Sequence, residues 1–262
     1  MRLKDKVAII TGGGTGIGKA IASVFASEGA RVVVAARTLA NLEQVVADIT
    51  SRGGVARAIQ TDVSDENQVQ RMVAQTLDEY GQVDILVNNH AAPGGGAQPI
   101  ASLDLDNWNR TLSINLTGSL LCVREVLKTM IPRKSGSIIN ISSLAGLYGA
   151  PDRGAYCVTK WGIIGFTEAL AIEVGEHNIR VNCISPGATK TDRFENSLKY
   201  KAKAADTTYE EITQEFLPHY SLNRVADPTE IATGALFLAS DDSSAITGHN
   251  LVITCGFHPM FP

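Results

Sequence analysis

Short apolar runs alternate with longer amphipathic segments along most of the chain. Runs rich in Val, Ile and Ala predict strands at 6–10, 31–36, 55–61, 83–89, 136–142, 179–185 and 249–254. Apolar positions at helical spacing predict helices at 16–28, 39–51, 65–80, 104–131, 155–175 and 228–239. Pro132 is expected to stop the fourth of these helices. Since several strands read as continuous apolar runs, the pattern predicts a parallel α/β sheet buried on both faces by helices.

The segment 187–226 is the least regular part of the chain, polar and mixed in charge. Within a domain spanning 1–262, a segment this long is usually a lid or a binding element. We therefore expect a substrate-binding lid there, with an idle surface insertion as the alternative.

Composition narrows the possible partners. The chain has 262 residues, 44% of them apolar and 19% charged, which is typical of a globular enzyme with one substantial core. A net charge of -4, with no basic block beyond "KYKAK" at 199–203, argues against nucleic acid and anionic membranes as partners. The apolar runs are shorter than the ~18 residues that span a bilayer, and the glycine-rich start does not resemble a signal peptide. The expected location is cytoplasmic.

Cysteines and histidines give no sign of a disulfide or a metal site. The four cysteines, Cys122, Cys157, Cys183 and Cys255, are scattered and form no C-x-x-C pair. The histidines, at 90, 177, 219, 249 and 258, lack metal-ligand spacing. No catalytic metal is expected.

The stretch "TGGGTGIG" at 11–18 directly follows the first predicted strand and opens the first helix. Gly12 permits a tight turn, Gly16 lets the backbone approach a pyrophosphate, and Gly18 allows close contact between helix and sheet. The N–H groups at the helix start would face the phosphates. This context predicts a dinucleotide site.

The end of the second strand bears on the cofactor. A cofactor without a 2′-phosphate is usually held there by an acidic residue, but Ala36 is followed by Arg37, and no carboxylate precedes Glu43. Since arginine suits a 2′-phosphate, the sequence favours NADP(H) over NAD(H). Alternatively, Arg37 stacks on the adenine or lies in solvent, which leaves NAD usable.

In "AYCVTK" at 155–160, Tyr156 and Lys160 lie one helical turn apart and share a face. A cation about 4–5 Å from the phenolate would stabilise it by at most roughly 3–4 kcal/mol at an effective dielectric near 20. The pair thus suits a general acid or base near neutral pH, although a chance pair remains the alternative.

These motifs together resemble the short, single-domain form of the short-chain dehydrogenase/reductase family, over roughly residues 5–256. In chain order, the matching segments are the glycine loop with Gly12, Gly16 and Gly18, "TDV" with Asp62, "NNHA" at 88–91, "SINLTG" with Asn115, "NISSLAG" with Ser143, "YCVTK" with Tyr156 and Lys160, and "SPGATKT" with Thr191. The resemblance implies a Rossmann-type fold, a nicotinamide cofactor and hydride transfer to or from a secondary alcohol or ketone, including sugars and polyols. It also implies a homotetramer or homodimer.

The resemblance further assigns roles to the catalytic residues. Tyr156 would be the acid in reduction and the base in oxidation, and Lys160 would support it and hold the nicotinamide ribose. Ser143 would donate to the substrate oxygen, and Asn115 would hold a water that relays protons towards Lys160. The alternatives are that Ser143 ties a turn, for which Ser142 is better placed, and that Asn115 marks a helix irregularity.

The remaining cofactor residues follow from the same resemblance. Asp62 would contact the adenine ring and Thr191 would face the nicotinamide carboxamide. The residues also assigned to the cofactor cleft are Thr15, Ile17, Val63, Asn89, Pro186, Gly187 and Thr189.

The sequence also departs from the family pattern. His90 and Ala91 replace the usual Ala-Gly, so an imidazole lies near the cofactor or substrate unless the site simply tolerates it. Trp161 follows Lys160, where a packing role is expected. The tail "ITCGFHPMFP" lacks the usual aspartate and could reach the cleft of a neighbouring subunit.

Substrate contacts are the least defined part of the prediction. The candidates near the cleft are Ser143, His90, Pro93, Leu144, Arg153, Arg193, Phe194, His219 and Tyr220. Arg153 would bind an anionic substrate group or would be a plain surface arginine. The glycines at 94–96 suggest a flexible edge or an ordinary loop.

Two other functions compete with the main prediction. One is reduction of an enoyl thioester C=C bond, which relatives of this fold perform. The other is a dinucleotide-sensing protein without turnover, which would need the glycine loop but not the set Ser143, Tyr156 and Lys160.

Overall fold

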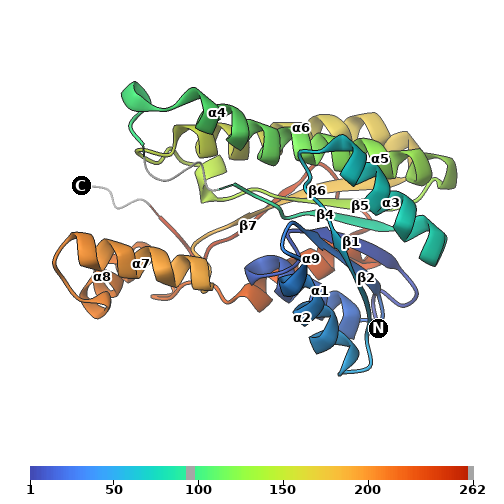
Figure 1. Ribbon diagram of the computed structural model, residues 1–262, viewed down its shortest axis with the longest axis horizontal. Helices are drawn as coiled ribbons and strands as arrows, with labels where there is room; N and C mark the ends of the chain where they lie inside the picture. Colours follow the sequence, from blue (N-terminus) through green and yellow to red (C-terminus); the bar gives the residue numbers. More distant parts are fainter. Residues whose placement is uncertain (93–97, 259–262) are drawn as a thin grey trace.

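The computed structural model describes residues 1–92 and 98–258, so Pro93 and the glycines at 94–96 lie outside the described residues. The described residues form a single parallel sheet in the order β3-β2-β1-β4-β5-β6-β7 (Figure 1). Its strands are β1 (Val7–Thr11), β2 (Arg31–Ala36), β3 (Val55–Gln60), β4 (Ile85–Asn88), β5 (Gly136–Ile141), β6 (Ile179–Pro186) and β7 (Asn250–Ile253). The predicted doubly wound parallel sheet of seven strands is confirmed for the part of the chain that the structure describes.

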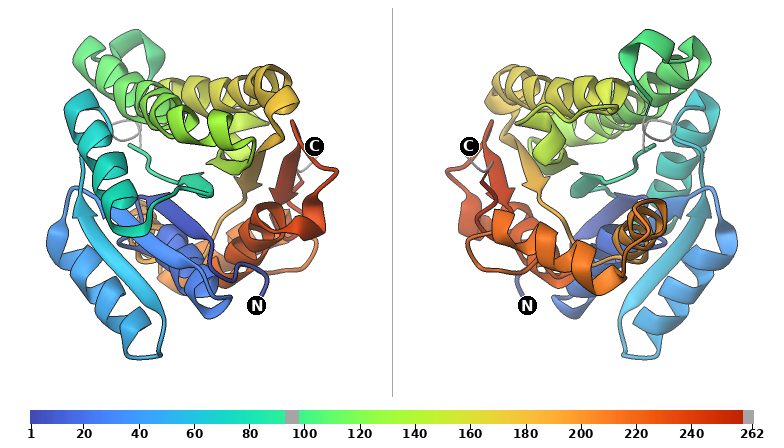
Figure 2. Two further views of the ribbon diagram at one scale, coloured as in Figure 1. Left: turned by 90° about the vertical axis from the view of Figure 1, so that its right-hand side faces the viewer. Right: turned by 90° about the vertical axis from the view of Figure 1, so that its left-hand side faces the viewer.

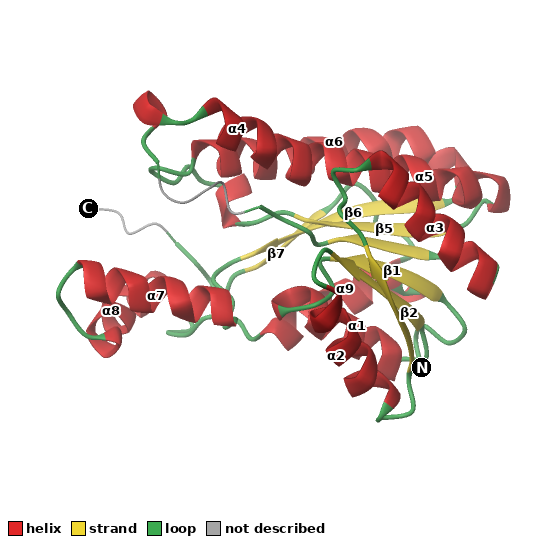
Figure 3. Ribbon diagram, viewed as in Figure 1, coloured by secondary structure: helices red, strands yellow, loops and turns green. Residues whose placement is uncertain are grey.

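The α-helices lie in two layers, one on each face of the sheet (Figures 2 and 3). They are α1 (Gly16–Ser27), α2 (Leu39–Thr50), α3 (Glu66–Tyr80), α4 (Leu105–Leu112), α5 (Gly118–Arg133), α6 (Gly154–Val174), α7 (Asp192–Ala204), α8 (Tyr209–Phe216) and α9 (Pro228–Ala239). Helices α1, α2 and α9 pack on one face, and α3, α5 and α6 pack on the other. Among the described helices, none is both long and apolar enough to cross a membrane.

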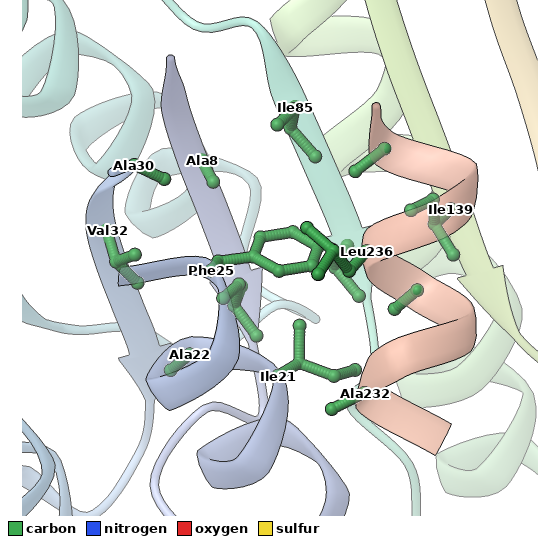
Figure 4. Packing of buried hydrophobic residues seen from close by; sticks show 14 of the residues in the cluster. Ala8, Ile21, Ala22, Phe25, Ala30, Val32, Ile85, Ile139, Ala232 and Leu236 are labelled. Carbon is green, nitrogen blue, oxygen red and sulfur yellow. The ribbon is translucent and has the colours of Figure 1, made fainter. Parts of the chain in front are cut away.

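Each central strand contributes side chains to both layers. In β1, Ala8 and Ile10 belong to the apolar cluster beneath α1 and α9, whereas Ile9 belongs to the cluster beneath α3 and α5. On the first face, the fully buried Phe25 of α1 packs towards Leu236 of α9 (Figure 4). The continuous apolar runs of the sequence reflect this burial on both faces.

The helical prediction at 104–131 is confirmed in outline, but the uniform helix and the stop at Pro132 are wrong. The chain forms α4, then a π-helical turn at Ser113–Thr117, and then α5, which ends beyond Pro132 instead of before it. A proline in the last turn removes only one backbone donor, and the helix ends where Lys134 takes a left-handed conformation (φ 50°). The π turn carries Asn115, whose contacts are described below.

The segment 187–226, the least regular part of the sequence, contains α7 and α8, which project from the helix layers (Figure 1). Its role as a lid stays a prediction. Helix α8 begins with a capping box in which Thr208 and Glu211 each bond the other's backbone N–H. Helix α7 has acidic residues in its first turn and lysines in its last, as the helix dipole favours. Both helices have few apolar residues, so no apolar run marks them in the sequence.

Candidate active site

The glycine loop lies between the carboxyl ends of β1 and β4. Gly12 and Gly16 have φ values of 63° and 53°, in the left-handed region that favours glycine. A Cβ atom on Gly18 would lie 2.2 Å from the Gly12 carbonyl oxygen and 2.5 Å from Asn89 Nδ2. The start of α1 therefore packs directly on backbone, which only glycine permits.

The first turn of α1 is open to an anion. Thr15 is its N-cap residue but makes no side-chain capping bond, and the first turn carries no acidic residue. Its backbone N–H donors therefore remain for a bound group, as a pyrophosphate requires. Thr191 lies beside this turn, since a Cβ on Gly16 would be 3.3 Å from its Cγ2.

A cavity of about 220 Å³ extends from the glycine loop to the end of β2. Asp62, Val63 and Arg37 line it, as the sequence suggested for an adenosine site. Ser64 donates its backbone N–H (3.0 Å) and its hydroxyl (2.6 Å) to Asp62 Oδ1, which fixes that carboxylate. The Arg37 side chain is exposed and has no carboxylate within ion-pair distance among the described residues.

Three further residues of this cavity were missed by the sequence reasoning. Thr38 and Asn41 follow Arg37 in "RTLAN", so a polar cluster around a phosphate was visible there. Arg110 comes from α4, which is remote in the sequence. No sequence signal places Arg110 beside the cavity.

Helix α6 brings Tyr156 and Lys160 together. The Lys160 side chain is buried at 3% exposure, and its Nζ lies 5.6 Å from the centre of the Tyr156 ring. Nζ donates to the Ile141 carbonyl oxygen at 2.7 Å, which is its one acceptor within the ranges that the structure describes. Two N–H donors of a buried ammonium thus remain for a bound group such as the ribose hydroxyls of a cofactor.

A second cation lies near the Tyr156 ring. The Arg153 guanidinium carbon is 5.1 Å from the centre of the Tyr156 ring, at the range of a cation–π contact. Arg153 is exposed and, within the described residues, forms no ion pair. It is therefore available to an anionic group near Tyr156.

The two serines after β5 have different roles. The buried Ser142 donates its hydroxyl to the Lys160 carbonyl oxygen at 2.7 Å, which ties the strand end to α6. Ser143 accepts the Ala145 N–H at 3.1 Å, while its own proton has no acceptor in the described part of the chain. Ser143 can therefore donate to a substrate oxygen.

Asn115 is buried in the π turn between α4 and α5. Its Oδ1 accepts the Ala92 N–H at 2.7 Å, and its Nδ2 donates to Thr159 Oγ1 at 3.0 Å. Thr159 in turn donates to the Tyr156 carbonyl oxygen at 2.8 Å. Asn115 thus lies at a helix irregularity, as one alternative had it, and beside the helix of Tyr156, while its role in holding a water stays a prediction.

His90 points its ring into the protein. Its Nδ1 lies 2.7 Å from Thr11 Oγ1 and its Nε2 lies 3.3 Å from Ser119 Oγ. Burial, followed by the charge of Lys160, lowers the pKa of the imidazole to about 3. With both nitrogens engaged, the ring offers no support for the substrate contact that the sequence suggested, although His90 lines the cofactor cavity.

The remaining substrate candidates lie on or beside α7 and α8. Arg193 is exposed in the first turn of α7. The His219 ring stacks on Phe257 with centroids 6.5 Å apart, and Tyr220 packs on the same ring at 5.4 Å. Tyr148, from the loop after Ser143, meets Phe257 at 5.8 Å. Phe257 thereby joins the segment after α8, the C-terminal segment and the loop that follows Ser143.

The parallel sheet, the open helix start behind a glycine turn and the tyrosine held beside a buried ammonium define a nucleotide-dependent oxidoreductase. Sequence comparison agrees, since residues 12–258 match the family model described as "Enoyl-(Acyl carrier protein) reductase". The chain belongs to the short-chain dehydrogenase/reductase family and is an oxidoreductase that uses a nicotinamide cofactor.

Three similar proteins illustrate its relatives. D-threitol dehydrogenase of Mycolicibacterium smegmatis is 36% identical over 256 residues, which cover 98% of this chain and 94% of the relative. The structure of NAD+-bound xylitol dehydrogenase matches with a TM-score of 0.92 and 32% identity, covering 98% of this chain and 100% of that one. A variant of actinorhodin polyketide ketoreductase with NADPH matches with a TM-score of 0.90 and 32% identity, covering 95% of each chain.

Lys160→Ala removes the ammonium that faces the cleft. We expect the dissociation constant for the nicotinamide cofactor to rise about tenfold, because charge-assisted hydrogen bonds are lost. Fluorescence titration measures this change. Lys128→Ala, which removes an exposed lysine of α5, is the control and should bind normally. Unchanged affinity of the Lys160 variant would mean that Lys160 does not contact the cofactor.

Proposed function

We propose that this enzyme transfers a hydride between NADP(H) and a secondary alcohol or ketone, with sugars and polyols among its possible small-molecule substrates. The observation that carries the proposal is the buried Lys160 ammonium, which has two free N–H donors beside Tyr156. A protein that only sensed dinucleotides could use Lys160 to hold the ribose, but it would not need a tyrosine hydroxyl beside that cation. The dehydrogenase and ketoreductase relatives support the same chemistry.

The chain's own groups would act on the substrate oxygen. The Tyr156 hydroxyl gives its proton to the carbonyl oxygen in reduction and takes it back in oxidation. The free Ser143 hydroxyl donates to the same oxygen and stabilises the charge that develops there. Lys160 stabilises the phenolate, and Asn115 holds the water that returns a proton towards Lys160. The bound nicotinamide supplies or accepts the hydride.

The segment 187–226 would cover the substrate. Thr191 starts α7 directly beside Gly16, and the end of α8 packs on the C-terminal segment through Tyr220 and Phe257. Both ends of the segment therefore attach close to the cofactor and catalytic residues. Arg153 and Arg193 are the exposed cations that would meet an anionic substrate group.

Reduction of an enoyl thioester is the second candidate, since the matched family model carries that description. The free Ser143 hydroxyl suits both reactions, because hydride addition to an enoyl thioester also builds charge on an oxygen, that of the enolate. The dehydrogenase and ketoreductase relatives favour the carbonyl reaction. An NADPH-consumption screen with ketones, sugars and a crotonyl thioester separates the two. Turnover of the thioester alone would replace the main proposal.

Tyr156→Phe tests the assigned acid. We expect kcat on the best substrate of the screen to fall by about 10²–10⁴, because the proton donor is lost. Cofactor affinity should stay near the wild-type value, since the ring remains. Tyr80→Phe on α3 is the matched control with normal turnover. Comparable kcat values for Tyr156→Phe and wild type would overturn the assignment.

Arg37→Asp tests the cofactor preference. Parallel titrations with NADPH and NADH should show tighter NADPH binding in the wild type. The variant should shift that preference towards NADH by about tenfold or more, since a charge-assisted contact becomes repulsive. Arg52→Asp, beyond the end of α2, controls for net charge. A preference that does not move would show that Arg37 is not the discriminator.

We also propose a homotetramer or homodimer. Helix α6 exposes Val158, Trp161 and Ile172 at helical spacing, with 54% of Trp161 and 85% of Ile172 accessible, so the packing expected of Trp161 needs a second chain. Light scattering should give a multimeric mass for the wild type and a lower mass for Trp161→Asp. Tyr200→Asp, on the exposed face of α7, should keep the wild-type mass. A monomeric wild type would contradict the proposal.

A further inference from the structure

A continuous series of buried hydrogen bonds crosses the protein beneath the cofactor cavity. It starts at Thr11, at the end of β1, and passes through the His90 ring to Ser119 on α5. The Ser119 hydroxyl donates to the Asn115 carbonyl oxygen at 2.9 Å. Asn115 then reaches Thr159 on the helix of Tyr156. His90 is thus the element that joins the end of β1 to the turn that carries Asn115.

The number of protons on Ser119 and His90 determines which group donates in each hydrogen bond of the series. The single proton of Ser119 goes to the Asn115 carbonyl oxygen, so the contact between Ser119 and His90 needs a proton on Nε2. Nδ1 of a neutral imidazole then carries none and must accept from the Thr11 hydroxyl, 2.7 Å away. Thr11 Oγ1 also accepts the Asn89 N–H at 3.1 Å, so its own proton stays free to be donated.

The opposite tautomer fits less well. A proton on Nδ1 would turn the Thr11 hydroxyl towards the Val87 carbonyl oxygen at 3.1 Å. Ser119 would have to donate across the longer 3.3 Å contact to Nε2, and the Asn115 carbonyl oxygen would lose its 2.9 Å bond. The Nε2–H form keeps the shorter bonds and supplies a donor to the buried turn.

The ring packs tightly on its α5 side. A Cβ atom on Gly118 would lie 3.2 Å from His90 Nε2 and 2.8 Å from Val63 Cγ2. The ring therefore fills a slot that exists because residue 118 has no side chain. The charged groups acting on the imidazole are Lys160 and Asp62, the Ile114 backbone of the π turn is a further hydrogen-bond partner, and burial dominates all three. The ring thus remains a neutral, fixed bridge.

We propose that His90 is a positioning residue for Asn115, holding the π turn against the end of β1 through its Nε2–H bond to Ser119. This inference rests on the proposed function, in which Asn115 holds the water of the proton relay. His90 contacts neither substrate nor reacting atoms in this arrangement. Its loss should therefore impair proton transfer more than cofactor binding.

The tautomer is tested without any substrate. In protein labelled with ¹⁵N-histidine, His90 should show the neutral form with the proton on Nε2 between pH 5 and pH 8, assigned by the signal lost in His90→Ala. Ser119→Ala should disturb that signal, since the acceptor of the Nε2 proton is removed. A proton on Nδ1, or a ring that titrates in this range, would overturn the proposal even if no substrate were ever found.

Matched variants test the positioning role with the best substrate of the screen. His90→Gln places an amide N–H near the position of Nε2, so it can still donate to Ser119. His90→Asn places its amide near the position of Nδ1, so it keeps a partner for Thr11 but loses the bond to Ser119. We expect kcat to fall about fivefold to tenfold in His90→Ala, His90→Asn and Ser119→Ala, as for one lost buried hydrogen bond. His90→Gln should keep most of the wild-type kcat. The cofactor dissociation constant should stay near wild type in all four.

A double variant and a control variant distinguish a positioning role of His90 from a general loss of stability. His90→Ala with Ser119→Ala should be no slower than either single variant, because both remove the same bond. Thr76→Val removes a buried hydroxyl that donates one turn back in α3, as Ser119 does in α5, and should keep the wild-type kcat. Additive losses, or equal kcat in His90→Gln and His90→Asn, would assign His90 a merely structural role.

Discussion

The site depends on the absence of a side chain at Gly18. The start of α1 lies so close to the Gly12 carbonyl and to Asn89 that a methyl group would overlap both. This contact fixes the first turn of α1 against the ends of β1 and β4, with its N–H groups uncapped. Nucleotide binding follows from the geometry, because those donors lack partners within the protein. The positions of Thr191 and the α7 start follow in turn, since they rest on the same loop.

The charge around the site is positive, although the net charge of the chain is negative. The protein carries a net charge of -4, yet Arg37, Arg110, Arg153 and Lys160 all face the site region without a carboxylate partner in the described residues. Elsewhere, most arginines pair with acids, as Arg133 does with Asp84. Unpaired cations in a cleft concentrate positive potential there, which attracts an anionic dinucleotide.

The sequence predicts the sheet well because both faces of its central strands are buried. These strands therefore appear in the sequence as mostly apolar runs. It predicts the glycine loop and the pair on α6 because their chemistry is local. It does not predict the break between α4 and α5, since the π turn is stabilised by bonds from Asn115 to Ala92, a remote residue. Helix α8 was predictable in principle from Thr208 and Glu211, whose spacing is that of a capping box. The partners of His90 depend on tertiary packing alone.

The contacts that three segments make with Phe257 affect where a tag can be fused to the chain. This ring, near the end of the described chain, contacts both Tyr148 beside the catalytic serine and Tyr220 beside α8. The amino terminus lies on the opposite side of the molecule from α7 and α8 (Figure 1), and Met1 and Arg2 pair there with Glu28 at the end of α1. A purification tag or surface tether fused to the carboxyl end would therefore follow closely on a ring that these segments share, whereas one fused to the amino end would follow on the pairing with Glu28.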